Sequence, residues 1–287
     1  GGVFLNTPDG PAFLRHIKGL SPKQTLLVQV TGYAEPGKAI PVTSKLLFKS
    51  RYVIVTPTAP GLNISRSIRD EDRRDALLQL IHETIGPPAY GMILRSSCAE
   101  ADPEDIADDA RAVLKLVSQV LEDDAQQIAV LLNADGAHEQ AWRDWSEPAQ
   151  IETETGCFAA HGVLDQIDAL KSADVSIHGG SFSIEPTRAF VAVDVNTGKD
   201  GSPAAGLKAN IAMARDLPRQ LRLRGLGGQI VIDPAPMPKK DRRQLETIFR
   251  AALRSDTVET NFVGWTTLGL IELQRARSRV PLQIKPQ

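Results

Sequence analysis

The chain has 287 residues, of which 42% are hydrophobic and 24% are charged, with a net charge of -2, and this composition predicts one large or two to three small globular domains. No apolar run approaches the ~18 to 20 residues of a membrane helix and no signal peptide opens the chain, which argues against a helical membrane protein. The two cysteines, Cys98 and Cys157, indicate neither a disulfide framework nor a zinc site, so we expect a cytoplasmic protein.

The first 43 residues are predicted to form small β-structure. Phe4 and Phe13 lie in short apolar strands joined by a polar turn, and a strong third strand is predicted at residues 25–31. Phenylalanines on such strands can stack on single-stranded bases, as in OB-folds, although more often they belong to a core. Lys38 lies in a Gly-Lys loop from which it can reach a phosphate, which alone is a weak signal.

Residues 44–121 are predicted to alternate strands with amphipathic helices. The strands are expected at 51–56 and 91–97, and the helices at about 70–83 and 102–121. Arg95 and Ser96 follow the apolar run of the second strand. A guanidinium beside a hydroxyl is a reasonable phosphate clamp because arginine binds phosphate through two hydrogen bonds. The alternative is an ion pair between Arg95 and the acidic helix that follows.

Residues 122–178 are the least informative part of the sequence. A strand is expected at 127–132 and a helix at 162–170. The histidines are too scattered to bind one metal ion, and we interpret them as structural or surface residues: His138, His161 and His178.

The central segment contains two apolar runs that each end in an aspartate. Residues 189–193 precede Asp194, residues 227–232 precede Asp233, and the intervening residues 207–224 carry apolar side chains at helical spacing. A strand, a crossover helix and a second strand form a βαβ unit, whose strands are parallel. We therefore expect both carboxylates at the carboxyl edge of the sheet, where open α/β folds build their sites.

The aspartate pair has two interpretations. Two carboxylates held close together repel each other, so they favour a shared proton or a cation. Asn196 adds a third oxygen, and without a nearby imidazole or thiolate the set suits a hard ion such as Mg²⁺. Aspartates also end strands as caps or turn formers, and the spacing alone does not decide between a metal site and this structural role.

Three more elements are predicted after Pro238. A helix is expected at 242–254, a strand near 259–263, and a last helix at about 267–277.

Basic residues are concentrated in the last third of the chain. Residues 181–287 contain 17 Lys and Arg against 10 Asp and Glu, whereas the preceding residues contain 16 against 25. A carboxylate pair suited to a metal within a positive segment predicts a polyanionic substrate, hence a nucleic acid or a phosphate ester. The alternative is that the basic clusters at 219–224, 239–243 and 275–279 are solvated helix faces.

Several motifs of the chain together resemble the ribonuclease E/G family. Around the aspartate pair these motifs are GG at 179–180, IEPT at 184–187, VDVNTG at 193–198, RQLRLR at 219–224, GGQIVID at 227–233 and GLIELQRAR at 269–277. Upstream, in the family's order, they are ISR at 64–66 and GMILRS at 91–96. The resemblance is poor only in the middle, at about 122–173.

The resemblance implies an endonuclease that uses Mg²⁺ to cut single-stranded RNA, leaving 5′-phosphate and 3′-hydroxyl ends, in RNA processing or decay. Asp194 and Asp233 match the family's metal-binding aspartates, and Asn196 matches the asparagine that orients the site. Arg95 and Ser96 match its pocket for a 5′-monophosphate end, with serine in place of the usual threonine.

The resemblance also implies residues that hold the RNA. Phe4, Phe13 and Lys38 match residues that grip RNA near the cleavage site, and Arg66 lies in the matching ISR segment. The expected partner is therefore single-stranded RNA, with a 5′-monophosphate at its end.

The resemblance implies an α/β fold (mixed α+β) that consists of four parts. These are a partial OB-fold at 1–43, a 5′-phosphate-sensor region at 44–121, an RNase H-like region at 122–178 and a DNase I-like catalytic domain at 179–287. Because the first residue is Gly rather than Met, we expect the sequence to begin inside a longer protein. No Cys-x-x-Cys follows the last predicted helix, so the zinc link that pairs subunits in long family members is absent or lies beyond Gln287, and the expected homodimer is one without a zinc link.

Two departures from the family pattern leave the catalytic strength open. Pro234-Ala235-Pro236 replaces the second aspartate that often follows Asp233, and the acidic residue often found two positions after Asn210 is missing. A first alternative is therefore a protein that binds 5′-monophosphorylated RNA without cutting it. A second alternative is a Mg²⁺-dependent phosphatase that acts on small molecules. This function accounts for the aspartates but gives no role to the basic clusters. The endonuclease is the leading hypothesis because both aspartates are present.

Overall fold

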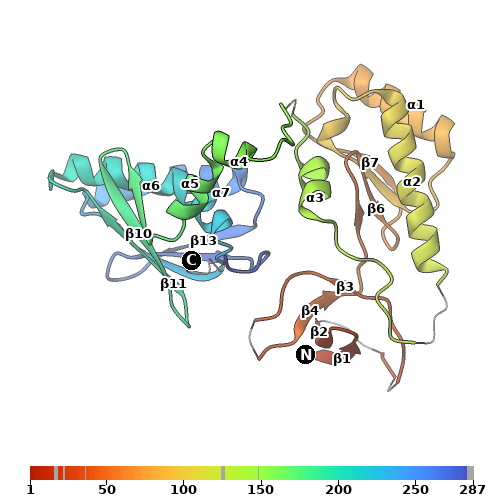
Figure 1. Ribbon diagram of the computed structural model, residues 1–287, viewed down its shortest axis with the longest axis horizontal. Helices are drawn as coiled ribbons and strands as arrows, with labels where there is room; N and C mark the ends of the chain where they lie inside the picture. The colour runs from red at the N-terminus through yellow and green to blue at the C-terminus, as the bar shows by residue number, and fades with distance from the viewer. Residues whose placement is uncertain (16–18, 22, 36, 124–126, 148, 283–287) are drawn as a thin grey trace. The chain divides into compact units, whose positions relative to one another are not determined.

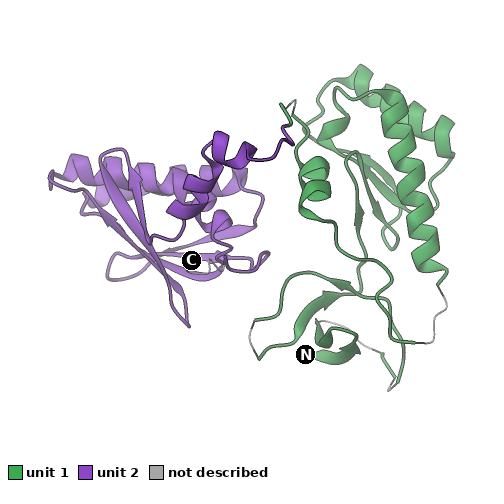
Figure 2. Ribbon diagram, in the orientation of Figure 1, with its two compact units in different colours: residues 1–151 green, residues 152–287 purple. Residues whose placement is uncertain are grey.

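The computed structural model describes residues 1–15, 19–21, 23–35, 37–123, 127–147 and 149–282. The chain divides into two compact units, residues 1–151 and 152–287 (Figure 2). Each unit combines β-sheet with α-helices (Figure 1), so the mixed α+β class expected from the sequence is confirmed. None of the helices found in these ranges is long and apolar enough to span a bilayer.

The first unit begins with a small four-stranded sheet of order β1-β2-β4-β3. Its strands are β1 (Gly2–Thr7), β2 (Gly10–Arg15), β3 (Gln29–Val30) and β4 (Ile40–Thr43). The sheet covers a small core centred on Ala12, Leu14 and Val42. The strong strand predicted at 25–31 is reduced to two residues, because only Gln29 and Val30 find ladder partners on β4.

A second four-stranded sheet, of order β5-β6-β8-β7, packs against two helices. Its strands are β5 (Phe48–Lys49), β6 (Val53–Thr56), β7 (Leu62–Ile64) and β8 (Gly91–Leu94), and its helices are α1 (Glu71–Ile85) and α2 (Pro103–Leu121). Both helices begin at an aspartate cap: Asp70 accepts from the Arg73 amide and Asp102 from the Glu104 amide. The predicted helices are confirmed to within two residues, whereas β8 stops at Leu94 and a 3-10 turn, η1 (Ser96–Cys98), follows.

The end of the first unit contains one helix, α3 (Ala137–Asp144). The strand predicted at 127–132 is wrong: this segment has no regular structure, and Ile128, Val130 and Leu132 are exposed. Apolar residues follow one another in 127–132 as they do in a buried strand. A strand also requires a neighbouring strand that pairs with its backbone groups, and among the described residues no strand pairs with this segment.

The second unit is built on a six-stranded sheet of order β13-β14-β12-β11-β10-β9. Its strands are β9 (Asp174–Ile177), β10 (Gly180–Pro186), β11 (Val191–Asn196), β12 (Gly228–Asp233), β13 (Thr260–Trp265) and β14 (Ile271–Arg275). Only β11 and β12 pair in parallel among the neighbours in this sheet.

Two long helices cover one face of this sheet (Figure 1). They are α6 (Pro203–Leu223) and α7 (Arg242–Ser255), the second preceded by a 3-10 turn, η2 (Lys239–Asp241). Two short helices, α4 (Cys157–Ala160) and α5 (Val163–Ala169), have no buried residues. Inward-facing residues of the strands alternate with outward-facing ones, which leaves the opposite face of the sheet with polar and small side chains.

The last predicted helix is wrong. Residues 271–275 form strand β14, which pairs with both β12 and β13. Ile271, Leu273 and Arg275 are buried while Gln274 is exposed, which is the period of two of a strand rather than the period of a helix. An arginine at an inward position concealed this alternation in the sequence.

Candidate functional site

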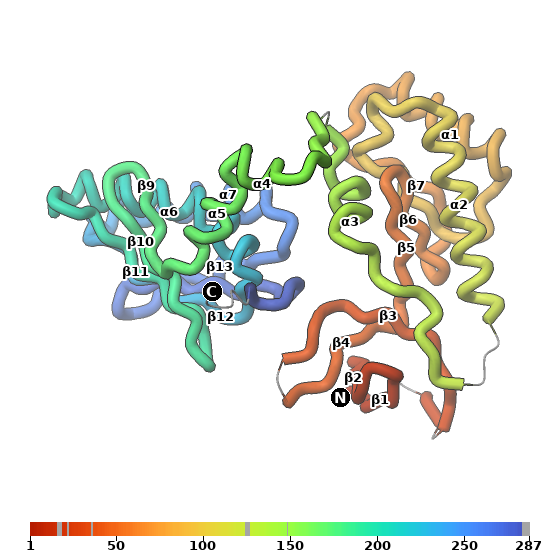
Figure 3. The backbone as a smooth tube through the Cα atoms, viewed as in Figure 1, coloured from red at the N-terminus to blue at the C-terminus, as the bar shows by residue number. Residues whose placement is uncertain are grey.

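The two aspartates of the candidate site lie side by side on neighbouring strands. Strand β11, helix α6 and strand β12 form the predicted βαβ unit, which can be followed along the chain in Figure 3. The parallel ladder places Asp194 directly opposite Asp233. Neighbouring strands are about 4.8 Å apart, so the two carboxylates lie within reach of one ion. The sequence-based placement of both residues at one sheet edge agrees with this register.

Both carboxylates lie on the open face of the sheet. Asp194 and Asp233 are exposed, whereas Val193, Val195 and Ile232 alternate with them and are buried beneath the helices. Because successive side chains of a strand point to opposite faces, the aspartates point away from the core. A polyanion can therefore reach them without any opening of the helical layer.

Asn196 belongs to the same cluster, with its amide nitrogen toward the carboxylate. It lies two residues after Asp194 on the same face of β11, and its Nδ2 donates to Asp194 Oδ2 at 2.7 Å. The residue pattern predicts a third oxygen ligand from Asn196, whereas the family resemblance implies an asparagine that orients the site. In the structure the Asn196 amide nitrogen donates to the Asp194 carboxylate and orients it.

The donor set fits a hard cation. Two carboxylates supply oxygen ligands and the Asn196 N–H supports one of them, and Mg²⁺ characteristically binds through one or two carboxylates while keeping several waters. Among the residues that the structure describes, no group of three or more His, Cys, Asp and Glu is arranged to enclose a metal ion. A cation held by two carboxylates alone would keep ligand positions for water and a phosphate oxygen.

A fully buried asparagine on α6 holds the chain just beyond Asp233. Asn210 is 0% exposed, and its Nδ2 donates to the Ala235 carbonyl while its Oδ1 accepts from the Ala235 amide, both at 2.9 Å. One turn earlier, a Cβ on Gly206 would lie 2.1 Å from the Pro236 carbonyl oxygen, so only glycine allows this close approach. This role of Asn210 is not among those predicted from the sequence, although a polar residue within the apolar face of a helix is a signal for it.

Three of the arginines that made the last third basic are structural. Arg275 and Asp256 form an ion pair of 2.6 Å in which both side chains are 1% exposed. Arg222 also bonds to Asp256, and Arg224 bonds to Gln220 and the Ser172 carbonyl. The positive charge of this segment is therefore partly internal, because Arg224 and Arg275 are buried and Arg222 is bonded to the buried side chain of Asp256.

The residues expected to stack on bases form one pair in the first unit. Phe4 lies opposite Phe13 in the β1–β2 ladder, and the ring centroids are 5.1 Å apart. Phe4 is 74% exposed, which is unusual for a phenylalanine that only fills a core. Lys38 is paired with Glu35 at 3.1 Å, and Arg66 is exposed in the turn after β7.

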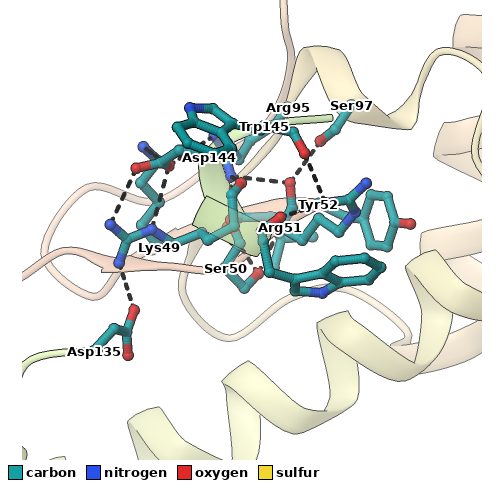
Figure 4. Close-up of polar contacts among 12 residues, drawn as sticks. Lys49, Ser50, Arg51, Tyr52, Arg95, Ser97, Asp135, Asp144 and Trp145 are labelled. Atoms are coloured by element: carbon teal, nitrogen blue, oxygen red, sulfur yellow. Dashed lines mark hydrogen bonds and ion pairs between the residues drawn. The ribbon is translucent and has the colours of Figure 1, made fainter. Parts of the chain in front are cut away.

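Arg95 is engaged within the protein, while its neighbour Ser96 is exposed. Burial lowers the pKa of the Arg95 guanidinium, and the nearby Asp144 opposes this effect. The guanidinium donates to the carbonyls of residues 50, 51 and 143 and forms an ion pair with Asp144 at 3.4 Å, as Figure 4 shows. Ser97, rather than Ser96, is bonded in this cluster, through Oγ to the Arg51 carbonyl at 2.6 Å.

Comparison with known proteins identifies the family. A sequence model described as the Ribonuclease E/G family matches residues 48–153 and 147–278. The chain belongs to the ribonuclease E/G family. Ribonuclease E of Nostoc sp. is 30% identical over 96% of this chain and 47% of its own length. Ribonuclease E of Synechocystis sp. is 29% identical over 96% of this chain and 48% of its own length.

Shorter relatives from the same family match as well. Ribonuclease G of Escherichia coli (strain K12) is 27% identical over 91% of this chain and 61% of its own length. The chain thus spans about half the length of the curated ribonuclease E relatives and about three fifths of this ribonuclease G. Both the aspartate pair and the Arg95 cluster lie within the segments that match the ribonuclease E/G family.

Proposed function

We propose that this chain carries the catalytic centre of a Mg²⁺-dependent endoribonuclease, which cuts single-stranded RNA to 5′-phosphate and 3′-hydroxyl ends in RNA processing or decay. The observation that supports this most is the in-register pair Asp194 and Asp233 on the open face of the sheet, in a member of the ribonuclease E/G family. A protein that only binds RNA gains nothing from two carboxylates facing a polyanion, since they repel it.

In the proposed mechanism, the protein positions one ion and one phosphodiester. Asp194 and Asp233 would hold Mg²⁺, and Asn196 orients the Asp194 carboxylate by donating to its Oδ2. Asn210 fixes the backbone after Asp233, so that this carboxylate is preorganised too. When bound, the ion would supply a water of lowered pKa and an offset for the charge that develops on the phosphoryl oxygens.

We also propose how the rest of the chain serves this reaction. Residues 1–43 form part of an OB-fold whose Phe4–Phe13 pair stacks on bases. Residues 44–121 sense the RNA 5′ end through Arg95, with Arg66 as a further phosphate contact. Residues 122–178 are RNase H-like and 179–287 DNase I-like. The exposure of Phe4 supports the role proposed for residues 1–43, and the cations around Arg95 support the role proposed for residues 44–121.

One observation favours an RNA-binding protein without turnover as the second candidate. The chain lacks an acidic residue directly after Asp233, where the backbone continues as Pro234-Ala235-Pro236. A two-carboxylate site holds a metal ion less tightly than one with a third carboxylate, because affinity rises with the charge of the ligand set.

Cleavage of a short unstructured RNA with a 5′-monophosphate tests the nuclease proposal. With Mg²⁺ we expect internal cutting that EDTA abolishes. Asp194→Asn and Asp233→Asn should each lower the rate at least about 100-fold, because even residues that only support metal ligands contribute 10–100-fold. Asp165→Asn, an exposed aspartate on α5, is the matched control and should cut as the wild type does.

Two outcomes decide between the candidates. Binding of the RNA without metal-dependent cutting by the wild type would support the second candidate. Metal-dependent cutting that survives both aspartate substitutions would place the active site elsewhere and contradict the proposal.

A further inference from the structure

The C-terminal end of helix α3 is docked in a cluster of cations, as the close-up in Figure 4 shows. Asp144, the last residue of α3, accepts from Lys49 Nζ at 2.6 Å and from Arg95 Nη2 at 3.4 Å through the same oxygen, Oδ1. Its other oxygen, Oδ2, lies 3.2 Å from Arg143 Nη2. Lys49 is on strand β5 and Arg95 follows strand β8, so both belong to the sheet rather than to the helix.

The last backbone carbonyls of α3 accept further hydrogen bonds from two arginines. Arg51 Nη1 donates to the carbonyls of residues 142 and 145, and Arg95 Nη1 donates to the carbonyl of Arg143 at 2.8 Å. The last carbonyls of a helix carry a partial negative charge. The last turn of α3 therefore offers the sheet's cations one carboxylate and three carbonyl oxygens, which is the kind of ligand that a terminal phosphate group offers.

Polar contacts dominate the docking of α3. No residue of the helix is buried, and Trp142 is 55% exposed even though the Arg51 guanidinium stacks on it, 4.0 Å from the ring centroid. Lys49 and Asp144 keep about a third of their side-chain surface exposed. Partly exposed ion pairs such as Lys49–Asp144 contribute little to stability, so this contact is one for which a stronger anion can compete.

We propose that Asp144 is a specificity-determining residue, which occupies the position of an RNA 5′-phosphate between Lys49 and Arg95 and is displaced only by a terminal phosphate. This inference rests on the proposed function, in which Arg95 senses the RNA 5′ end. It adds that the sensor site is filled by the protein's own carboxylate, and that Lys49 is a further phosphate ligand. Arg143 belongs to α3 and leaves with it.

Charge explains the selectivity. A phosphate monoester carries about -1.5 to -2 at neutral pH with three acceptor oxygens, whereas Asp144 carries -1 with two. Burial alone raises the pKa of Asp144, but hydrogen bonds from Arg143 and Lys49 lower it to about 2, so the competing carboxylate stays charged at any physiological pH. An internal phosphodiester carries a single negative charge, no more than Asp144 does. A 5′-hydroxyl end carries no charge, so neither group can displace the Asp144 carboxylate.

Removing the negative charge of Asp144 should increase the affinity for RNA with a 5′-monophosphate, because the phosphate no longer competes with a carboxylate for Lys49 and Arg95. We expect Asp144→Asn to bind 5′-monophosphorylated RNA about 5-fold or more tightly than the wild type, in the range of typical coupling between sites. For RNA of the same sequence that ends in a 5′-hydroxyl, the affinity should change by less than this gain. The measurement is fluorescence anisotropy with both RNAs in EDTA, which keeps them intact. Lys49→Met should weaken binding of the monophosphorylated RNA only.

Glu139→Gln is the matched control. Glu139 lies on the exposed first turn of the same helix, so its substitution removes the same charge away from Lys49 and Arg95. Equal gains for Asp144→Asn and Glu139→Gln would show a general charge effect and overturn the inference. So would an unchanged affinity of the Asp144 variant.

Hydrogen exchange of the wild type provides a second test that needs no variant. Adding 5′-monophosphorylated RNA should speed amide exchange in residues 137–145, and 5′-hydroxyl RNA should not. Unchanged exchange with bound monophosphorylated RNA would mean that α3 is not displaced. None of these measurements depends on cleavage, so the inference can fail while the metal-dependent cutting described above still succeeds.

Discussion

Asp256→Ala is expected to lower the free energy of unfolding of the second unit by about 3–5 kcal/mol, the usual cost of removing one partner from a buried ion pair. Asp256 is the carboxylate between two arginines: its Oδ2 lies 2.6 Å from Arg275 Nη1, and its Oδ1 bonds to Arg222. Arg275 also donates to Thr260 Oγ1 at 2.7 Å. Without Asp256, the guanidinium of Arg275, which is 1% exposed, remains buried without a counter-charge.

This cluster joins elements that are distant along the chain. Asp256 caps the end of α7, Arg222 lies near the end of α6, and Arg275 lies on β14. The substitution should therefore loosen both helices from the sheet, and urea unfolding followed by circular dichroism measures the loss. Asp168→Ala removes an exposed partner of Lys171 and should cost less than about 0.5 kcal/mol. A loss below about 1 kcal/mol for Asp256→Ala would contradict the structural role of the cluster.

The same cluster shows why a count of charged residues is a poor guide to which arginines lie at the surface. Arg222 and Arg275 count as positive in the sequence, but the structure pairs both with a single aspartate, 34 and 19 residues away. Charge counting treats every arginine as solvated. The burial of Arg275 follows from its inward position on β14, and that segment was predicted to be a helix. Because this segment was predicted as a helix, Arg275 was counted among the exposed positive charges, whereas in strand β14 it is buried.

The aspartate pair was predictable because its strands carry local signals. Each run is apolar, is bounded by glycine or proline, and ends in the aspartate, and the helix between them has a clear apolar face. A right-handed crossover then leaves little freedom in how the strands pair. The contacts of Arg95 were not predictable in this way. Two of them, the Arg143 carbonyl and the Asp144 carboxylate, come from the end of α3, about 48 residues further along the chain. They lie in residues 122–178, the least informative part of the sequence.

Asn210→Asp is expected to weaken the metal binding that we propose at Asp233 about 10- to 100-fold, the usual effect of removing a group that supports a metal ligand. Asn210 makes two hydrogen bonds of 2.9 Å with the backbone of Ala235, two residues after Asp233. The aspartate variant keeps the size of the side chain and the acceptor for the Ala235 amide. It replaces the donor with an oxygen that faces the Ala235 carbonyl, so the loop is pushed away from α6.

The control for Asn210 separates positioning from stability, because a buried polar group left unpaired also costs about 1–3 kcal/mol. Gln220 is a buried amide on the same helix that bonds to Asp216 and Arg224, away from the loop that follows Asp233. Gln220→Leu should lower the melting temperature while Mn²⁺ binding, measured by electron paramagnetic resonance, stays at the wild-type level. Asn210→Asp should lower both. If Asn210→Asp destabilises the protein yet binds Mn²⁺ as the wild type does, then Asn210 only packs the helix, and the position of Asp233 is determined by the β11–β12 ladder alone.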